Sequence, residues 1–293
     1  MSPVTRREFM KTSLAVGALS SVGTLPVHAA PRSATDMVTL GECGMRVTRL
    51  AFGTGTNNGR DYSAMGQQEF TRLVHYAYDR GIRFFDTCDT YTTPAMLGEA
   101  LKGIPRDSYQ LMTKLTTNGA DPQTHFEQML RVSQTDYYDI VLLHWQHTPD
   151  WVSTTANWQD GVLQAQEKNI FRVRGASVHG LPALRQMPGN KWLQVAMIRM
   201  NHLGTRMDGP TAVDGNNPDN VDEVVEHARQ VKKEGMGLIG MKLVGNGAFT
   251  SRDDRQAAMR FAFNHAGADC VSVGFKNSQE IDEAIENVKL ALA

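Results

Sequence analysis

The stretch "FFDTCDTY", residues 84–91, opens with two aromatic residues and then carries three closely spaced polar side chains, those of Asp86, Asp89 and Tyr91. Aromatic residues favour strands, whereas carboxylates are poor strand formers and costly to bury. One interpretation is that a strand stops at Asp86 and a turn follows. The other is that the strand carries Asp86 to an active site and the turn brings Tyr91 beside it. The surrounding sequence has to distinguish these two interpretations.

Short apolar segments of the same kind recur along the chain and alternate with helical patterns. They are "LAFGTG" from Leu50, "RFFDTCD" from Arg83, "YQLMTKL" from Tyr109, "YDIVLLHW" from Tyr138, "FRVRGASVHG" from Phe171, "WLQVAMIRMN" from Trp192, "GLIGMKLVGNG" from Gly237 and "CVSVGF" from Cys270. Repeated βα units imply a parallel sheet, and this many favour closure. The chain is therefore predicted to be α/β, a (β/α)8 TIM barrel of the usual length of about 250 residues.

Local signals refine this prediction. Residues 38–50, "VTLGECGMRVTRL", predict an N-terminal β-hairpin that closes the barrel floor. Thr93 and Pro94 form a typical N-cap and first-turn pair for a helix. The longest irregular stretch, residues 202–219, is expected to cover the catalytic face and to influence substrate choice. We find no linker within residues 31–293, so this part is predicted to be one domain.

Residues 1–30 predict a twin-arginine signal peptide. Arg6 and Arg7 precede a weakly apolar run, and Val27-His28-Ala29 is a small-residue cleavage pattern. The run is too short and too rich in Gly and Ser to span a bilayer, so no transmembrane segment beyond the signal is expected. The alternative is a basic amphipathic helix. The signal predicts a periplasmic or otherwise exported protein, with the twin-arginine export machinery as a partner and a cofactor acquired before export.

Composition excludes other classes of protein. The formal net charge of the 293 residues is -1, which gives no electrostatic reason to expect nucleic acid as a partner. The three cysteines, Cys43, Cys88 and Cys270, are odd in number and far apart, so they imply no disulfide framework.

Polar residues end three successive predicted strands. Asp86 ends the second, Lys114 the third and His144 the fourth, while Tyr91 lies in the loop after Asp86. Each has a structural explanation when taken alone, as a turn cap, a lysine that reaches solvent or a buried core histidine. Together they lie on the face where barrel enzymes perform chemistry. A buried lysine is costly without a partner, and Asp86 is the nearest plausible one.

On these residues the chain resembles the aldo/keto reductase family over essentially all of residues 31–293. The family's Asp-Thr-Ala run, with a tyrosine five residues after the aspartate, is matched by Asp86, Thr87 and Tyr91, with Cys88 where alanine is usual. The lysine after a threonine in "LMTKL" and the histidine after "DIVLLH" match as well.

The resemblance implies an NAD- or NADP-dependent oxidoreductase acting on an aldehyde, ketone or sugar. Tyr91 would protonate the carbonyl oxygen, and Lys114 would lower the pKa of Tyr91. Asp86 would hold Lys114, and His144 would orient the carbonyl through a ring fixed by a second, unidentified partner. No metal is needed, because the cofactor supplies the reducing equivalents.

The cofactor positions implied by the resemblance are Gly53, Thr54, Ser177, Met241, Gly245, Gly247, Lys276 and Glu283. Ser177 matches the serine that holds the carboxamide, but Val178 and Met197 stand where asparagine and glutamine are usual. Met241 replaces a tyrosine that commonly stacks on the nicotinamide. Glu280 stands where a phosphate-binding arginine often lies, which favours NAD over NADP, although Lys276 could offset it.

Two charged residues within predicted strands, Arg199 and Lys242, have two possible orientations. If they point outward they contact a helix. If they point inward they make the pocket positive, which suits an acidic or multiply hydroxylated substrate.

Two other functions are compatible with parts of the pattern. A metal-dependent barrel hydrolase would use the histidines that follow strands, His144, His147, His179 and His202, together with Asp86 and Asp89. Against it, the first strand supplies no ligand pair. A non-catalytic exported barrel that binds a ligand or partner is the other alternative, motivated by the replaced carboxamide and stacking residues.

Overall fold

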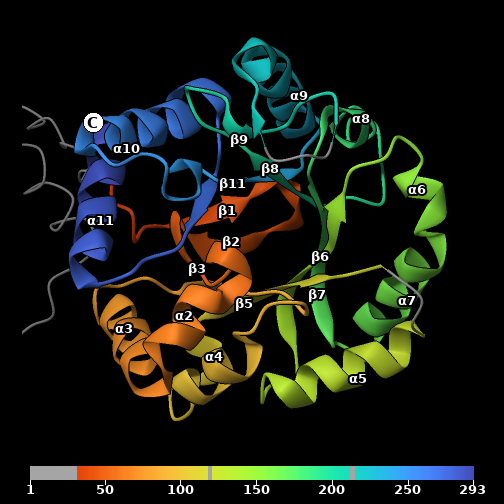
Figure 1. Ribbon diagram of the computed structural model, residues 1–293. Helices are drawn as coiled ribbons and strands as arrows, with labels where there is room; N and C mark the ends of the chain where they lie inside the picture. Colours follow the sequence, from red (N-terminus) through yellow and green to blue (C-terminus); the bar gives the residue numbers. More distant parts are fainter. Residues whose placement is uncertain (1–31, 118–120, 212–214) are drawn as a thin grey trace, which may run out of the picture. The chain divides into compact units, whose positions relative to one another are not determined.

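Eight parallel strands close into a barrel in the computed structural model, which describes residues 32–117, 121–211 and 215–293 (Figure 1). The strands are β3 (Leu50–Gly53), β4 (Phe84–Asp86), β5 (Gln110–Leu115), β6 (Tyr138–Gln146), β7 (Phe171–Val178), β8 (Val195–Arg199), β11 (Gly237–Met241) and β12 (Cys270–Val273). The last strand, β12, pairs with both β11 and the first barrel strand, β3, and so completes the ring. The (β/α)8 barrel predicted from the sequence is confirmed.

Helices surround the barrel (Figure 1). They are α2 (Arg60–Met65), α3 (Gln67–Asp79), α4 (Pro94–Leu101), α5 (Pro122–Val132), α6 (Trp151–Thr154), α7 (Ala156–Glu167), α8 (Leu181–Leu184), α9 (Val221–Lys233), α10 (Arg252–Arg260), which continues as a π-helix over Phe261–Ala266, and α11 (Ser278–Leu292). Short 3-10 turns lie at Gly41–Cys43, Thr56–Gly59, Arg106–Ser108, Pro218–Asn220 and Gly245–Gly247.

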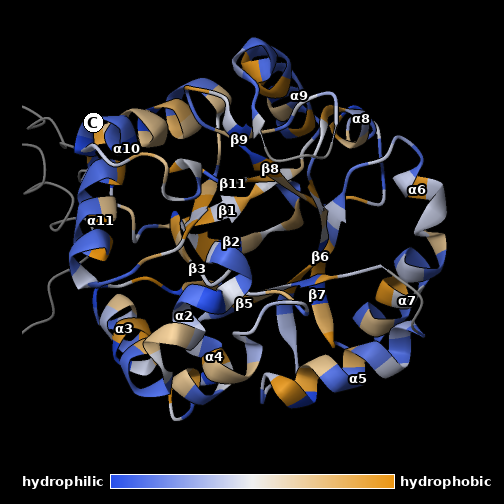
Figure 2. Cartoon of the chain, in the orientation of Figure 1, coloured by the Kyte–Doolittle hydropathy of each residue, from blue (hydrophilic) through white to orange (hydrophobic). Residues whose placement is uncertain are grey.

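Two apolar layers follow from the sequence pattern. Helix α9 buries Val224, Val225, Ala228 and Val231, which recur at helical spacing, and exposes polar residues between them. The barrel strands are apolar on both faces because one face fills the barrel and the other packs against helices. Figure 2 shows the result, with hydrophobic strands at the centre and hydrophilic residues on the outer surfaces of the helices.

The floor of the barrel is closed by the predicted hairpin. Its strands are β1 (Met37–Leu40) and β2 (Met45–Thr48), which pair antiparallel. Leu40 and Val47 are fully buried and belong to the same apolar cluster as the interior residues of the barrel. Gly41, with φ of +48°, lies so close to the Gly235 carbonyl that a Cβ there would come within 2.3 Å of its oxygen. The hairpin prediction is confirmed.

One local prediction is confirmed for the positions of the residues but not for the capping bond. Helix α4 begins at Pro94 with Thr93 as its N-cap residue, but the Thr93 side chain makes no capping hydrogen bond. Its hydroxyl donates instead to Thr54 Oγ1 at 2.9 Å. The threonine therefore joins two loops of the barrel mouth rather than the helix end.

The long segment after β8 contains a small antiparallel pair of strands, β9 (Thr205–Met207) and β10 (Gly215–Asn216). Arg199, at the end of β8, pairs with Asp208 at 3.0 Å, and both side chains are buried. This ion pair fixes the start of the segment against the barrel. Arg199 therefore does not line the pocket described below, whereas Lys242 does.

Residues 32–293 form one compact unit. Within the described ranges, every helix is too short or too polar to cross a bilayer. The predicted signal peptide, residues 1–30, lies outside the described residues.

Candidate active site

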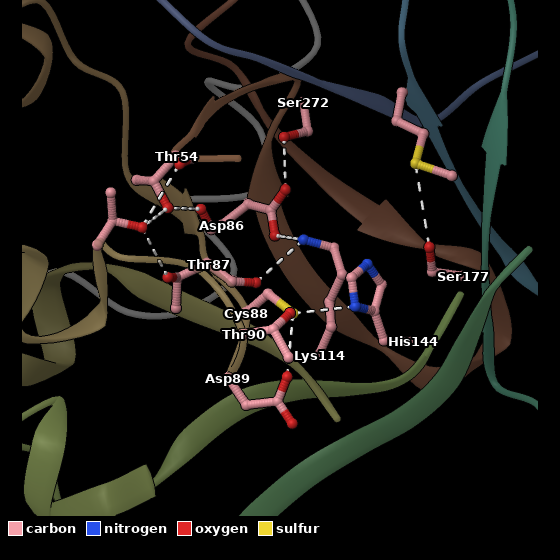
Figure 3. Close-up of polar contacts among 12 residues, drawn as sticks. Thr54, Asp86, Thr87, Cys88, Asp89, Thr90, Lys114, His144, Ser177 and Ser272 are labelled. Atoms are coloured by element: carbon pink, nitrogen blue, oxygen red, sulfur yellow. Dashed lines mark hydrogen bonds and ion pairs between the residues drawn. The ribbon is translucent and has the colours of Figure 1, made fainter. Parts of the chain in front are cut away.

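A buried ion pair lies at the mouth of the barrel. Lys114, near the end of β5, donates to Asp86 Oδ1 at the end of β4, and the two side chains are 2% and 5% exposed. Lys114 also donates to the Thr87 carbonyl at 3.0 Å. The second carboxylate oxygen of Asp86 accepts from Ser272 Oγ of β12 at 2.8 Å (Figure 3). The expected contact between Lys114 and Asp86 is therefore present.

Tyr91 lies over this pair. The Lys114 ammonium nitrogen is 5.1 Å from the centre of the Tyr91 ring. The ring also packs against the chain at Gly55, where a Cβ would come within 2.5 Å of the tyrosine hydroxyl. Gly55, in the loop that follows β3, thus provides the space that the tyrosine occupies. Sequence reasoning did not identify this glycine, because its role depends on a contact with a loop far away in the chain.

Electrostatics keep Tyr91 and Lys114 protonated. Enclosure by protein atoms raises the pKa of Tyr91, and the charge and hydrogen bond of Lys114 only partly oppose that rise. For Lys114, burial lowers the pKa, but the charge of Asp86 outweighs burial and the pKa is raised. Lys114 lowers the pKa of Tyr91 as expected, but desolvation exceeds this effect, so the net pKa is raised. The phenol of Tyr91 is therefore protonated near pH 7.

His144, on β6, faces Tyr91 across the site. The two ring centres are 5.9 Å apart and nearly perpendicular. Burial, followed by the charge of Lys114, lowers the pKa of His144 to about 3, so the imidazole is neutral near pH 7. The second partner of the ring is Cys88, whose Sγ lies 3.0 Å from Nδ1 (Figure 3). With Nδ1 in this contact, Nε2 is the nitrogen left to face a substrate.

Asp89 supports this arrangement from behind. Its carboxylate accepts from the Thr116 backbone at 2.6 Å and from His125 Nε2 at 2.8 Å. Its other oxygen accepts from Thr116 Oγ1 at 2.8 Å and lies 3.2 Å from Cys88 Sγ. Burial raises the pKa of Asp89, but these hydrogen bonds outweigh burial and the pKa is lowered. Asp89 therefore links its own loop to the loop after β5 and to helix α5, and it does not line the cavity described below.

All four predicted catalytic residues line one cavity of about 1490 Å³. It extends from Asp86, Tyr91, Lys114 and His144 to Arg255 and to the start of α11. Ligand sites for drug-sized molecules are commonly about 300–1,000 Å³, so this cavity has room for a dinucleotide and a small substrate.

The predicted cofactor residues divide into two groups. Gly53, Met241, Gly247, Lys276 and Glu283 line the cavity. Thr54 and Ser177 are fully buried behind the lining, and Gly245 lies in the turn that supports Gly247. The turn residue Asn246 and both of these glycines have positive φ values.

His179 lines the cavity where Ser177 was expected to do so. It follows β7, is 9% exposed and has Nε2 3.3 Å from Ser177 Oγ. Its ring centre is 5.8 Å from that of His144. Burial, then the charge of Arg199, lowers the pKa of His179 well below its usual value, so this ring is also neutral. Side chains two residues apart in a strand point to the same face, so Ser177 and His179 share a face at the end of β7. This periodicity was the signal in the sequence that could have identified His179 as a cavity residue.

An exposed aromatic pair lies at the cavity rim. Trp145 is 52% exposed and has φ of +55°, unusual for a bulky residue. The pairing of β6 with β7 is irregular at this point, and the His147 ring centre lies 4.4 Å from that of Trp145. The irregularity turns the indole toward the entrance.

At the far end of the cavity, Arg255 of α10 and Glu283 of α11 form a two-point ion pair, with distances of 2.6 and 2.9 Å. The carboxylate of Glu280 accepts from the Lys276 backbone at 2.7 Å. The cationic side chains here are thus Arg255, which is committed to Glu283, and Lys276.

The expected substrate loop lies elsewhere. None of the described residues between 202 and 219 line the cavity. Within the described ranges, the cavity is instead lined by residues that follow β3, β4, β5, β6, β7, β11 and β12.

The histidines proposed for a metal-dependent hydrolase do not gather. Among the described residues, the group that could hold a metal is Cys88, Asp89 and His144, whose ligand atoms lie within 4.8 Å of one another. His147, His179 and His202 are not part of it.

Comparison with known proteins identifies the family. The sequence profile of the aldo/keto reductase family matches residues 49–260, more than half of the chain. The chain therefore belongs to the aldo/keto reductase family, which places it among oxidoreductase enzymes.

Curated relatives match over shorter stretches. The chain is 26% identical to methylglyoxal reductase DkgB from Salmonella typhi over 164 residues, which are 54% of this chain and 56% of that protein. It is 38% identical to probable aldo-keto reductase 1 from Glycine max over 80 residues, 26% of this chain and 23% of that protein. The chain thus spans about half or less of the length of these relatives.

Solved structures support the fold. A putative aldo-keto reductase from Pseudomonas aeruginosa matches with a TM-score of 0.70 at 19% identity, covering 89% of this chain and 97% of that one. An aldo-keto reductase from Klebsiella pneumoniae in complex with NADPH matches with a TM-score of 0.66 at 15% identity, covering 87% and 90%.

Proposed function

We propose that the protein is an exported, nicotinamide-dependent reductase that interconverts a carbonyl group and an alcohol. The observation that carries this proposal is the convergence of Asp86, Tyr91, Lys114 and His144 at one end of a cavity that is large enough for a dinucleotide. Family membership supports it, because the matched relatives are named as reductases.

Each of the four residues has a separate task in carbonyl reduction. A bound NADH or NADPH would supply the hydride. Tyr91 donates its phenolic proton to the carbonyl oxygen, which becomes the hydroxyl of the product, and a raised pKa keeps that proton in place beforehand. Lys114 stabilises the phenolate that remains, and Asp86 keeps Lys114 charged. Neutral His144 donates a hydrogen bond to the carbonyl oxygen from Nε2.

The cavity fits the cofactor in two respects. The turn at Gly245–Gly247 brings backbone close to the cavity beside Lys242, an arrangement suited to a pyrophosphate. His179, with a donor and an acceptor on a neutral ring, is the polar side chain best placed to hold a carboxamide near His144, since Ser177 is covered.

We further propose a preference for NAD over NADP. Glu280 and Glu283 both line the far end of the cavity, and Arg255 is engaged by Glu283. A 2′-phosphate placed there would meet two carboxylates, and of the described cations that line this end of the cavity, Lys276 is the one not engaged by Glu283. The Glu280→Gln variant should therefore improve the NADPH to NADH ratio of kcat/KM several-fold, while the Glu286→Gln variant, on an exposed part of α11, should leave it unchanged.

The substrate is proposed to be a small carbonyl compound, because a curated relative is a methylglyoxal reductase. Export through the twin-arginine pathway is proposed from Arg6, Arg7 and the pattern that follows them. Folding before export would let the protein carry its cofactor out of the cytoplasm.

Native mass spectrometry of the purified protein tests the proposal, followed by fluorescence titration with NADH and NADPH and by a panel of aldehydes, ketones and sugars. We expect nucleotide binding and turnover of at least one carbonyl compound. The alternative of a non-catalytic barrel, favoured by Val178, Met197 and Met241 at the carboxamide end, predicts neither bound nucleotide nor a fluorescence change.

A further inference from the structure

A thiol, an imidazole and a carboxylate meet behind His144, on the side of the ring away from the proposed reaction. We propose that Cys88, Asp89 and His144 form a binding site for a soft divalent cation such as Zn²⁺, and that its occupancy inhibits the enzyme. The inhibition rests on the proposed function, whereas the binding itself does not.

The donor atoms are already close together. Cys88 Sγ lies 3.0 Å from His144 Nδ1 and 3.2 Å from Asp89 Oδ1, and all three ligand atoms lie within 4.8 Å of one another (Figure 3). Sulfur, imidazole nitrogen and carboxylate oxygen are the three ligand types that zinc takes in proteins. A tetrahedral zinc with bonds of about 2.0–2.3 Å separates its ligands by roughly 3.3–3.7 Å. The two contacts of Cys88 therefore need to open by about 0.5 Å, while the ligand atoms of His144 and Asp89, within 4.8 Å of each other, have to reach the same range.

The carboxylate is held as metal ligands usually are. Asp89 Oδ2 accepts from His125 Nε2 of α5 at 2.8 Å and from the Thr116 backbone at 2.6 Å. These bonds leave Oδ1, which also accepts from Thr116 Oγ1, turned toward Cys88. Outer contacts of this kind orient a ligand and are as important to affinity as the ligand itself.

The charges of the site balance when a dication is bound. Lys114 and Asp86 neutralise each other as a buried pair. When the cation binds, the Cys88 thiol releases its proton to solvent, and the resulting thiolate and the Asp89 carboxylate offset the two positive charges. Balance matters here because Cys88 is fully buried and the Asp89 side chain is 4% exposed, so an uncompensated charge would be costly.

The cation can reach the cluster from the cavity. His144 and Thr90 line the cavity wall, and Thr90 Oγ1 is 3.4 Å from Cys88 Sγ. The cluster thus lies one layer below the cavity surface, where a water molecule can complete a fourth coordination position.

Occupancy should slow carbonyl reduction because the His144 ring has to move to admit the ion. Misplacement of a substrate-orienting group by less than 1 Å lowers rates strongly, by up to about 100-fold. The thiol ligand distinguishes this chain, since Cys88 stands where the family usually has alanine.

The experiment titrates the full-length protein with Cd²⁺ and follows the ultraviolet charge-transfer band that a cadmium–thiolate bond produces. The same preparation is assayed for reductase activity with increasing Zn²⁺, then with EDTA. The variants are Cys88→Ala, Cys88→Ser and Asp89→Asn. The matched control is Cys43→Ala, which removes a half-buried thiol at the barrel floor.

We expect one cadmium per chain in the wild type and in Cys43→Ala, with Zn²⁺ lowering the rate at least tenfold and EDTA restoring it. In Cys88→Ala the cadmium band should disappear. The factor by which Zn²⁺ lowers the rate, measured against the metal-free rate of the same variant, should be at least tenfold smaller than in the wild type. Asp89→Asn should weaken cadmium binding at least tenfold. Circular dichroism checks that each variant is folded, and Cys88→Ser replaces Cys88→Ala if the latter is not.

The proposal is overturned if the band persists without Cys88, or if Cys43→Ala abolishes it. It is also overturned if Zn²⁺ inhibits the wild type and the Cys88 variants equally. Because the cadmium band needs no turnover, a protein that binds Cd²⁺ through Cys88 but reduces no carbonyl contradicts the proposed function and leaves the cation site standing.

Discussion

Two buried aspartates at opposite ends of the barrel have similar partners and different consequences. Asp139, in the second position of β6 at the floor, is 1% exposed and accepts from Arg106 and Arg172, each at 2.9 Å, and from the Leu111 backbone at 2.9 Å. Asp86, at the mouth, is 4% exposed and accepts from Lys114 and Ser272. Burial and pairing therefore do not separate a structural carboxylate from one that we propose supports catalysis.

The difference lies in what the cationic partner touches next. Arg106 also donates to the carbonyls of Tyr109 and Tyr137, so the network at the floor ends in backbone. Lys114 instead lies under the Tyr91 ring and lines the cavity. In a barrel the carboxyl ends of the strands carry chemistry and the amino ends carry stability. Three pairs of variants and one pH dependence test this contrast between mouth and floor.

The largest difference is expected between Tyr91 at the mouth and the buried Tyr138 near the floor. Tyr91→Phe removes the proposed proton donor and should lower kcat by about 10³-fold, within the 10²–10⁴ range of acid catalysis. Tyr138→Phe removes a hydroxyl that bonds Ser133 at 2.6 Å near the floor, and should leave kcat within twofold while costing about 1 kcal/mol of stability. Steady-state kinetics and urea unfolding measure both. A Tyr91→Phe enzyme with a tenth of normal activity would contradict the assigned role.

Substitution of the two aspartates should affect different properties, the rate at the mouth and the stability of the protein at the floor. Asp86→Asn is expected to lower kcat about 100-fold, because Lys114 loses the anion that keeps it charged and in place. Asp139→Asn should leave kcat nearly unchanged but destabilise the protein by about 3–5 kcal/mol, because two arginines lose their shared anion. Equal effects of the two variants on kcat would remove the distinction between mouth and floor.

A smaller effect is expected from pH. The pKa of His144 is about 3 in the folded protein, below the usual value of about 6.5. The unfolded chain therefore binds the proton first as pH falls, and stability should decrease from about pH 6.5 down to about pH 3. The cost is at most about 1.4 kcal/mol per pH unit. Thermal unfolding across this pH range should show that His144→Gln loses less stability than the wild type as the pH falls. If stability decreased equally with pH in both proteins, a buried neutral His144 would be excluded.

The smallest effects concern the secondary partner of each carboxylate. Ser272→Ala, at the mouth, should reduce kcat roughly threefold to tenfold through a less well fixed Asp86. Arg172→Ala, at the floor, should cost less than about 1 kcal/mol, because its guanidinium is half exposed and Arg106 remains. A change in kcat for Arg172→Ala would show that the floor influences the chemistry after all.

The sequence predicts the barrel and the contact between Asp86 and Lys114 for local reasons. Apolar strands recur with regular spacing, and a lysine at the end of a buried strand requires an anion. The roles assigned to Asp86, Tyr91, Lys114 and His144 remain predictions until the variants are measured.

Other features depend on contacts between distant segments that no local pattern encodes. Cys88 as the partner of His144 joins the loop after β4 to β6, and Arg255 with Glu283 joins two helices. The placement of His179 in front of Ser177 depends on how β7 ends. The net rise in the pKa of Tyr91 required knowledge of how completely the protein encloses it. Residues 202–219 were expected over the cavity because of their length, but their described part is fixed beside β8.

The hydrogen bond from Ser272 ties the buried Asp86–Lys114 pair to β12, a strand 186 residues further along the chain. Until β12 pairs with both β11 and β3, the ring of strands is open and Asp86 lacks this donor. The ion pair thus obtains its last partner only on closure of the ring, so we expect the proposed activity to return on refolding no earlier than that closure.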